Sequence, residues 1–438
     1  RLAVVRSVHE EHRLTELEPG VRIVTESMDS VRSVALGFWI GTGSAHEAEE
    51  RAGLSHLLEH MLFRGTASYS SVEIDQIFDG WGAELNAGTG RESTSVFTRV
   101  LDVHLADAFD VMAEMVWRPR LADEDLSQER QIVLEELAMY EDDPQDRVFD
   151  LLGEAVFGSH PLGRAIIGRR EVVAGVSGEA LRAFHHARYT GPNVVVAAAG
   201  SVDHDQVVEL VRKRLDAVPD AAPQRDDPGS PQDHVAPRRR FIAKETEQYH
   251  VCLGAPGIAR DDDRRFALRV LDSLLGGTSS SRLFQEVREK RGLAYSVYSF
   301  VSLYAQTGQV GLYLGTRPDN VGVALEVVAT ELQRLLEDGV TAEELERARE
   351  HVKGRMVLSL ESTVARMNRL GGAVLAGLPV LTVDETIERL DAVTVEDVTG
   401  LARELYAPER LSAAGIGADE KAFGAALAPI SERLAQAA

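Results

Sequence analysis

The two halves of this chain repeat one order of elements, and this repetition restricts the possible fold more than any other feature of the sequence. Each half opens with a pair of β-type segments followed by a helical segment, at residues 21–40 and 240–255. Each half ends with a helical segment and a short apolar strand, at 174–200 and 391–417. The sequence therefore predicts an α+β fold made of two duplicated domains, each a mainly antiparallel sheet packed with helices.

A stretch rich in Pro, Asp, Gln and Gly separates the two copies at residues 219–238 and shows no hydrophobic periodicity. This composition is typical of a linker. The predicted organisation is an N-terminal domain over 1–218, the linker, and a homologous C-terminal domain over 239–438. A chain of 438 residues is long enough for domains with sizeable cores.

Charge and cysteine content exclude several classes of protein. A net charge of −23 argues against nucleic acids and anionic membranes as partners. The single cysteine, Cys252, rules out an intrachain disulfide and suits a reducing compartment. No apolar run approaches the length that spans a bilayer, and the first residues, RLAVVRSVHEEHRL, contain no signal-peptide core. We expect a bacterial cytoplasmic location, with an organellar matrix as the second choice.

One helical stretch of the N-terminal domain, GLSHLLEHMLFRGT at residues 53–66, carries side chains suited to metal chemistry. A helix turns by about 100° per residue, so His56, Glu59 and His60 point the same way. Two imidazoles one turn apart can chelate a divalent metal, and a carboxylate beside them can take a proton from a metal-bound water. H-x-x-E-H is the reversed form of the H-E-x-x-H zinc-protease helix. The alternative is a helix with two half-exposed histidines and a surface glutamate.

A catalytic zinc normally takes three protein ligands, and a second helix, predicted from Glu124 to Tyr140, offers candidates for the third. Glu129 and Glu136 fall two turns apart in its apolar stripe, where an unpaired carboxylate is costly to bury. Glu135 falls on the polar side. We predict Glu136 as the third ligand and Glu129 as a carboxylate that supports the site. Pairing of Glu129 with an arginine at the rim of the stripe is the alternative.

The C-terminal copy lacks an H-x-x-E-H sequence but carries a different pair of residues. A glycine-serine loop leads into a helix that Gly292 is suited to end, and a strand follows. Arg288 lies in the last helical turn and Tyr295 near the start of the strand, so the two side chains can converge. A guanidinium and a phenol are suitable donors to a developing oxyanion. Arginine and tyrosine at such positions are also commonly structural.

Four stretches together resemble the pitrilysin family of inverted zinc metalloproteases, close to the branch of mitochondrial processing peptidase and its short bacterial homologues. They are GLSHLLEHMLFRGT, ERQIVLEELAMYEDDP, GSHPLGR and SSSRLFQEVREKRGLAYSV. In that family both histidines and a glutamate 76 residues after the second one bind zinc, and this glutamate is Glu136 here. The family's site-supporting glutamate matches Glu129. Its Asn-Ala pair, which holds the substrate backbone on an edge strand, matches Asn86 and Ala87.

The resemblance also implies an activity and an assembly. Four family domains enclose a chamber, and this chain carries two, so it would form half of a clamshell and need a second subunit. The family's Arg and Tyr match Arg288 and Tyr295, which would serve the zinc site of the other subunit and favour a homodimer. The implied function is that of a zinc endopeptidase for unfolded peptides, with one Zn²⁺ per chain and Glu59 as general base. The alternative is a non-catalytic structural subunit of a processing complex.

Overall fold

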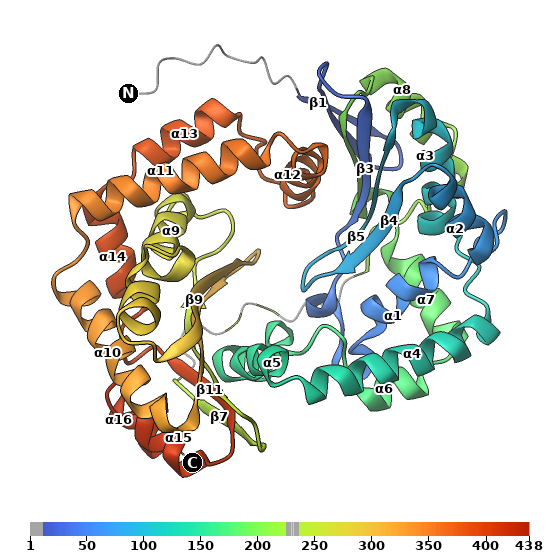
Figure 1. The fold of residues 1–438 in the computed structure, drawn as a ribbon. Helices are drawn as coiled ribbons and strands as arrows, with labels where there is room; N and C mark the ends of the chain where they lie inside the picture. The colour runs from blue at the N-terminus through green and yellow to red at the C-terminus, as the bar shows by residue number, and fades with distance from the viewer. Residues whose placement is uncertain (1–11, 225–228, 230, 232–235, 438) are drawn as a thin grey trace. The chain divides into compact units, whose positions relative to one another are not determined.

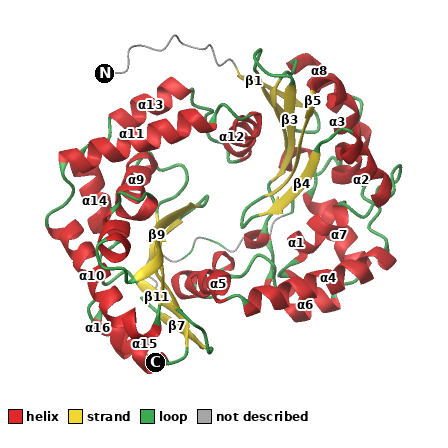
Figure 2. Ribbon diagram, viewed as in Figure 1, coloured by secondary structure: helices red, strands yellow, loops and turns green. Residues whose placement is uncertain are grey.

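The computed structural model describes residues 12–224, 229, 231 and 236–437, which form two compact units (Figures 1 and 2). Each unit combines one β-sheet with packed helices, so the predicted α+β class is confirmed. Unit 1 comprises Arg1–Leu137, Ala165–Pro228 and Val357–Glu385, and unit 2 comprises Ala138–Arg164, Gly229–Met356 and Thr386–Ala438.

The sheet of unit 1 has six strands among the described residues, in the order β1-β2-β6-β3-β5-β4. Strands β2 and β6 pair in parallel, and all other neighbours pair antiparallel. In the part of the chain that the structure describes, β4 pairs with β5 alone, so its other side is an open edge. The strands are β1 (His12–Leu17), β2 (Val21–Ser27), β3 (Ser33–Ile40), β4 (Glu84–Thr89), β5 (Thr94–Leu101) and β6 (Val194–Gly200).

The larger core of unit 1 lies on one face of this sheet. Side chains of a strand alternate between faces, so Val34, Leu36, Phe38 and Ile40 of β3 all point into this core. Helices complete it, among them the predicted metal helix α1. They are α1 (Leu54–Leu62), α2 (Ser71–Gly80), α3 (Leu105–Trp117), α4 (Asp123–Asp142), α6 (Arg170–Gly175), α7 (Gly178–Arg188) and α8 (His204–Arg212).

The opposite face of the sheet is covered by α12 (Thr363–Leu375), which comes from the C-terminal half of the chain (Figure 1). Its apolar side, including Met367 and Leu370, packs on small and β-branched residues of β2, β3 and β6. Glu26 of β2 is 2% exposed and accepts hydrogen bonds from Arg366 and Arg369 of α12. A charged cluster therefore joins the helix to the sheet beside the apolar contact.

The sheet of unit 2 has five strands among the described residues, in the order β7-β11-β8-β10-β9. Only β7 and β11 pair in parallel within this described sheet. Helix α5 (Pro144–Phe157), from the N-terminal half of the chain, packs on β8 and β11. The strands are β7 (Arg239–Ala243), β8 (Tyr249–Gly257), β9 (Ala294–Leu303), β10 (Gly308–Thr316) and β11 (Ser412–Gly417).

The other α-helices, together with two π-helical segments of unit 2, complete the fold apart from short 3₁₀ turns. No helix among the described residues is long and apolar enough to cross a lipid bilayer. These helices are α9 (Arg265–Asp272), η7 (Ser273–Gly277, π), η8 (Phe284–Glu289, π), α10 (Val321–Glu337), α11 (Ala342–Ser359), α13 (Val383–Asp391), α14 (Val395–Leu405), α15 (Glu420–Ala426) and α16 (Glu432–Gln436).

The two sheets share one topology, because β2-β6-β3-β5-β4 and β7-β11-β8-β10-β9 have the same order and the same single parallel pair. This agreement supports the predicted duplication. The compact units differ from the predicted division of the sequence in one respect, because each contains a helix from the other half, α12 or α5. Each sheet has apolar residues on both faces, and the exchanged helix covers the second one. The predicted linker, 219–238, is described only in part.

We expect Glu26→Gln to lower the free energy of unfolding by about 3 kcal/mol, because it removes from a buried cluster the anion that pairs with both guanidinium groups. Urea unfolding followed by circular dichroism measures the change. Glu16→Gln, an exposed position on β1, is the matched control. Equal midpoints for the two variants would show that the cluster does not stabilise the contact of α12 with the sheet.

Candidate metal centre

Helix α1 is only nine residues long, and its start is held by a carboxylate from outside the helix. Glu47, which is buried, accepts hydrogen bonds from the backbone N–H groups of Gly53 (2.8 Å) and Ser55 (2.6 Å). The first N–H groups of a helix have no partner within it, and an anion there also suits the helix dipole. Gly53 adopts a left-handed φ of +107° at this turn, which favours glycine. Glu47 thereby fixes where the helix begins.

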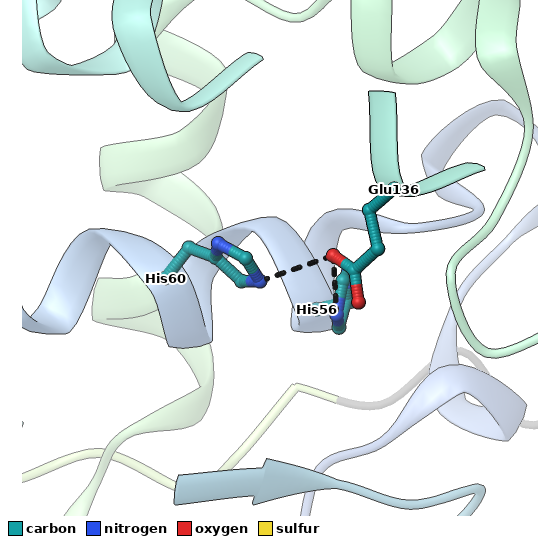
Figure 3. Close-up of side chains that lie close together, drawn as sticks. All are labelled: His56, His60 and Glu136. Carbon is teal, nitrogen blue, oxygen red and sulfur yellow. Dashed lines mark ion pairs between the residues drawn. The ribbon is translucent and has the colours of Figure 1, made fainter. Parts of the chain in front are cut away.

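The apolar side of α1 is fully buried in the core of unit 1, so its polar side is presented in a fixed direction. Figure 3 shows Glu136 reaching from α4 to the two imidazoles of α1. Glu136 Oε2 lies 3.7 Å from His56 Nε2 and 3.5 Å from His60 Nε2. In the part of the chain that the structure describes, these three residues form the one group of His, Cys, Asp and Glu side chains able to hold a metal, with ligand atoms within 4.8 Å of one another.

The spacing and protonation of these groups fit a divalent metal. Two ligands of a tetrahedral zinc with bonds of about 2.0 Å lie roughly 3.3 Å apart, close to both measured separations. Burial, with a smaller effect of His60, lowers the pKa of His56 to about 4, so its imidazole is neutral near pH 7. Glu135, one position along α4, is exposed to solvent. The helical spacing therefore separates the two glutamates as the sequence predicts.

A second carboxylate orients His60 from behind. Glu129 Oε2 lies 3.0 Å from His60 Nδ1, and the Glu129 side chain also forms an ion pair with Arg64. Glu129 is 3% exposed; burial raises its pKa, but the hydrogen bonds and charges of His60 and Arg64 outweigh burial and lower it. Glu129 thus contacts both a predicted ligand and an arginine, and its supporting role at the site stays a prediction. A carboxylate on Nδ1 leaves Nε2 of His60 facing the candidate site.

The carboxylates around His60 make the centre attractive to a cation. Burial lowers the pKa of His60, but the hydrogen bond and charge of Glu129, with Glu136 and Glu59, raise it overall. The same negative field that favours a proton on the imidazole favours a metal ion at Nε2. The donor set, its spacing and its charge therefore fit zinc.

Glu59 lies on the same helix and is largely buried. Thr89, the last residue of β4, donates a hydrogen bond of 2.5 Å from Oγ1 to Glu59 Oε2. Burial raises the pKa of Glu59, while the Thr89 hydrogen bonds and the charge of His60 partly oppose the increase. A carboxylate with a raised pKa is better matched to taking up a proton near neutral pH.

The predicted substrate-binding residues Asn86 and Ala87 lie in β4, the edge strand that also carries Thr89. Side chains alternate along β4, so Ala87 and Thr89 share the partly buried face and Asn86 lies on the exposed one. This strand packs against α1. The structure therefore places an open sheet edge beside the candidate metal centre, and the predicted edge strand is present.

Arg288 and Tyr295 converge on each other in unit 2. The Arg288 guanidinium carbon lies 4.5 Å from the centroid of the Tyr295 ring and 4.7 Å from that of Phe284. Tyr295 is 74% exposed. The predicted helix before Gly292 is present but contains the π-helix η8, and Gly292 follows it with a left-handed φ of +59°. The two side chains therefore contact each other, and the tyrosine is accessible to solvent.

The sequence patterns did not identify three residues of the centre, Glu47, Arg64 and Thr89. Arg64 and Thr89 had available signals: Arg64 lies one helical turn after His60, and Thr89 shares a strand face with Ala87. Glu47 had none, because its contacts are with backbone N–H groups and no side-chain pattern encodes them.

The fold and the centre define the class of protein: an α+β chain in which an inverted H-x-x-E-H helix and Glu136 form a group that could hold a metal. The family model described as insulinase (peptidase family M16) matches residues 22–170, and the model described as peptidase M16 inactive domain matches 175–352. An uncharacterized zinc protease of Streptomyces coelicolor is 44% identical over 90% of this chain and 87% of its own length. One of Bacillus subtilis is 43% identical over 88% and 94%. This chain belongs to peptidase family M16, which confirms the resemblance to the pitrilysin family.

Two solved structures share the fold. The peptidase M16 inactive domain from Pseudomonas fluorescens has a TM-score of 0.84 at 23% identity, covering 93% of this chain and 98% of the other. A protease from Helicobacter pylori has a TM-score of 0.87 at 21% identity, covering 93% and 99%. At these identities the likeness concerns the arrangement of the chain, so the chemistry has to be argued from the residues.

We expect Glu136→Gln to lower zinc affinity by more than the roughly 10- to 100-fold that loss of an outer hydrogen-bond partner costs, because it removes a charged ligand. Zinc per chain after dialysis against a weak chelator measures the change. Glu135→Gln, one position along the same helix, is the matched control and should keep its zinc. The reverse pattern would refute Glu136 as the ligand.

Proposed function

We propose that this chain is a zinc metalloendopeptidase that cleaves unfolded peptides. The observation that carries the proposal is the convergence of His56, His60 and Glu136, with their ligand atoms within 4.8 Å of one another. Membership of family M16, in which the Streptomyces and Bacillus relatives are named zinc proteases, supports a peptidase. The partly buried Glu59 on the same helix, whose pKa is raised by burial, supports general base catalysis.

In this proposal His56, His60 and Glu136 hold one Zn²⁺ per chain. A zinc ion so held would lower the pKa of a coordinated water toward neutrality and polarise the substrate carbonyl. Glu59 takes a proton from the attacking water and returns it to the leaving amine. Glu129 keeps His60 in the tautomer and orientation that present Nε2, and Arg64 holds Glu129 in place.

We propose that the substrate adds as a further strand to the open edge of β4, near Asn86 and Ala87. Main-chain hydrogen bonds to an edge strand need an extended peptide with free N–H and C=O groups. A folded protein pairs these groups internally and cannot offer such a segment, so unfolded peptides are the expected substrates. The edge location of β4 and its contact with α1 support this arrangement.

We further propose that the working unit is a homodimer enclosing a chamber, in which Arg288 and Tyr295 of one subunit stabilise the oxyanion at the zinc site of the other. Their mutual contact and the exposure of Tyr295 support a prearranged donor pair. One chain carries both residue sets, which is the reason for favouring two identical subunits. The cytoplasmic location and the lack of nucleic-acid or membrane partners stay predictions from the sequence.

The alternative is a non-catalytic structural subunit of the same family. The description of the model that matches 175–352 as an inactive domain is compatible with it, but that model covers the half without the histidines. A scaffold has no need of three converging ligand side chains and a buried Glu129, which are costly to keep. Peptide cleavage that a zinc chelator abolishes and added zinc restores would exclude the scaffold.

We expect Glu59→Gln to retain zinc and peptide binding but to lower kcat by roughly 10²- to 10⁴-fold, because the amide cannot accept a proton from water. Cleavage of a quenched fluorescent peptide, with zinc measured on the same preparation, checks both parts. Glu135→Gln again serves as the exposed control. Near wild-type turnover by Glu59→Gln would remove the general base from the proposal.

We expect subunits with Glu59→Gln and subunits with Tyr295→Phe, each weakly active alone, to recover activity when mixed and re-formed into dimers. Each mixed dimer would contain one site in which Glu59 and the partner's Tyr295 are both present. Random pairing makes half of the dimers mixed, so recovery to roughly a quarter of wild-type kcat is expected. Mixed dimers, verified by a tag on each variant, that show no recovery would contradict action between subunits.

A further inference from the structure

The hydroxyl of Thr89 is held between α1 and the hairpin of β4 and β5. It lies 2.5 Å from Glu59 Oε2, 3.4 Å from the backbone oxygen of Ser55 and 3.5 Å from Thr94 Oγ1. A hydroxyl has one proton to donate, so these acceptors compete for it. The carboxylate is the nearest and the only charged one, and 2.5–2.7 Å is typical of an O–H donor to a carboxylate. The Thr89 hydroxyl therefore donates its proton in a hydrogen bond to Glu59 Oε2.

Thr94 keeps this arrangement from changing. It is fully buried, and its own hydroxyl donates to the backbone oxygen of Thr42 at 2.9 Å. Its proton is thus committed elsewhere, and Thr94 Oγ1 can act toward Thr89 only as a distant acceptor. The side chain of Thr89 thus lies between the buried side chain of Thr94 and the carboxylate of Glu59.

We propose that Thr89 is a positioning residue for the general base: its hydroxyl holds Oε2 of Glu59 and leaves Oε1 to exchange the proton. The inference rests on the proposed function, since it concerns the residue assigned there as the base. A carboxylate free to rotate about its terminal bond presents either oxygen in many directions. The short hydrogen bond from the Thr89 hydroxyl, with a further one from the Thr89 backbone N–H, restricts this rotation before the substrate arrives.

The position of Thr89 also links the base to the strand proposed to bind substrate. Thr89 ends β4, two residues beyond Ala87 and on the same face. A peptide added along β4 would contact the strand that carries the donor, so substrate binding and orientation of Glu59 share one element. The alternative is a purely structural role, in which the hydrogen bond only stabilises the packing of β4 on α1.

Three variants distinguish the two roles. Thr89→Val keeps the shape and β-branching but loses the hydroxyl, Thr89→Ser restores the hydroxyl, and Thr98→Val is the matched control. Thr98, on the neighbouring strand β5, donates to the backbone oxygen of Glu84 at 2.8 Å and so removes a hydroxyl from the same hairpin without touching Glu59. Thr89→Ala replaces Thr89→Val if the valine variant does not fold.

We expect Thr89→Val to lower kcat roughly 10- to 100-fold with KM and zinc content unchanged, because a small misplacement of a catalytic group costs about this much. Thr89→Ser should stay near wild type, and Thr98→Val should keep its kcat. Added to Glu59→Gln, Thr89→Val should lower the residual rate no further, since the two changes remove one function. Steady-state kinetics on the zinc-loaded proteins give kcat, KM and the residual rate in the Glu59→Gln background. Zinc analysis gives the zinc content.

A Thr89→Val variant with the kcat of Thr98→Val, or with a raised KM and unchanged kcat, would overturn the positioning role while leaving the proposed peptidase intact. An additive effect in the Glu59→Gln background would also overturn it. If Glu59→Gln keeps near wild-type turnover, the general-base assignment fails and this inference fails with it. Failure of the positioning role alone is recognised by an inactive Glu59→Gln beside a Thr89→Val variant with unchanged kcat.

Discussion

The placement of α1 is the constraint on which the candidate centre depends. A helix of nine residues is not stable alone, because isolated helices shorter than about 12–15 residues are marginal in water. Its stability comes from Leu57, Leu58 and Met61, which are buried against the sheet. Its direction comes from charged groups at both ends, Glu47 at the start and the pair of Glu129 with Arg64 near the end. The helix that carries the two histidines is therefore held at its start, along its apolar side and near its end.

Because α5 and α12 are exchanged, each compact unit contains segments from both halves of the sequence. The sheet that supports α1 is closed on its other face by α12, which is encoded more than 160 residues after β6. Amphipathic patterning predicts that a helix such as α12 must cover an apolar surface, but the pattern is the same whichever sheet is covered. This is why the predicted division at 219–238 follows the repeat along the sequence and yet does not describe the compact units.

The parts of the centre that the sequence could predict are those governed by local periodicity. The 3.6-residue repeat separates Glu136 from Glu135 and puts Glu59 beside His56 and His60. Asn86 and Ala87 are predicted from the family resemblance instead. Contacts between a side chain and a distant backbone or hydroxyl follow no period. Glu47 at the helix start and Thr89 on Glu59 belong to this kind, so they emerge only once α1 and β4 are placed together.

The two units have the same strand order but different candidate functional residues, so the topology alone does not determine the chemistry. Unit 2 repeats the strand order of unit 1, and the helix that follows β8, α9, stands where α1 follows β3, yet its sequence RFALRVLD contains no histidine. A metal needs three donors within a few ångströms, and the described residues of the second copy contain no such group. The second copy instead carries Arg288 in η8 and Tyr295 near the start of β9, an edge strand of the described sheet. One architecture thus supplies a candidate metal-and-base centre in one copy and a candidate oxyanion pair in the other, and side chains alone make the difference.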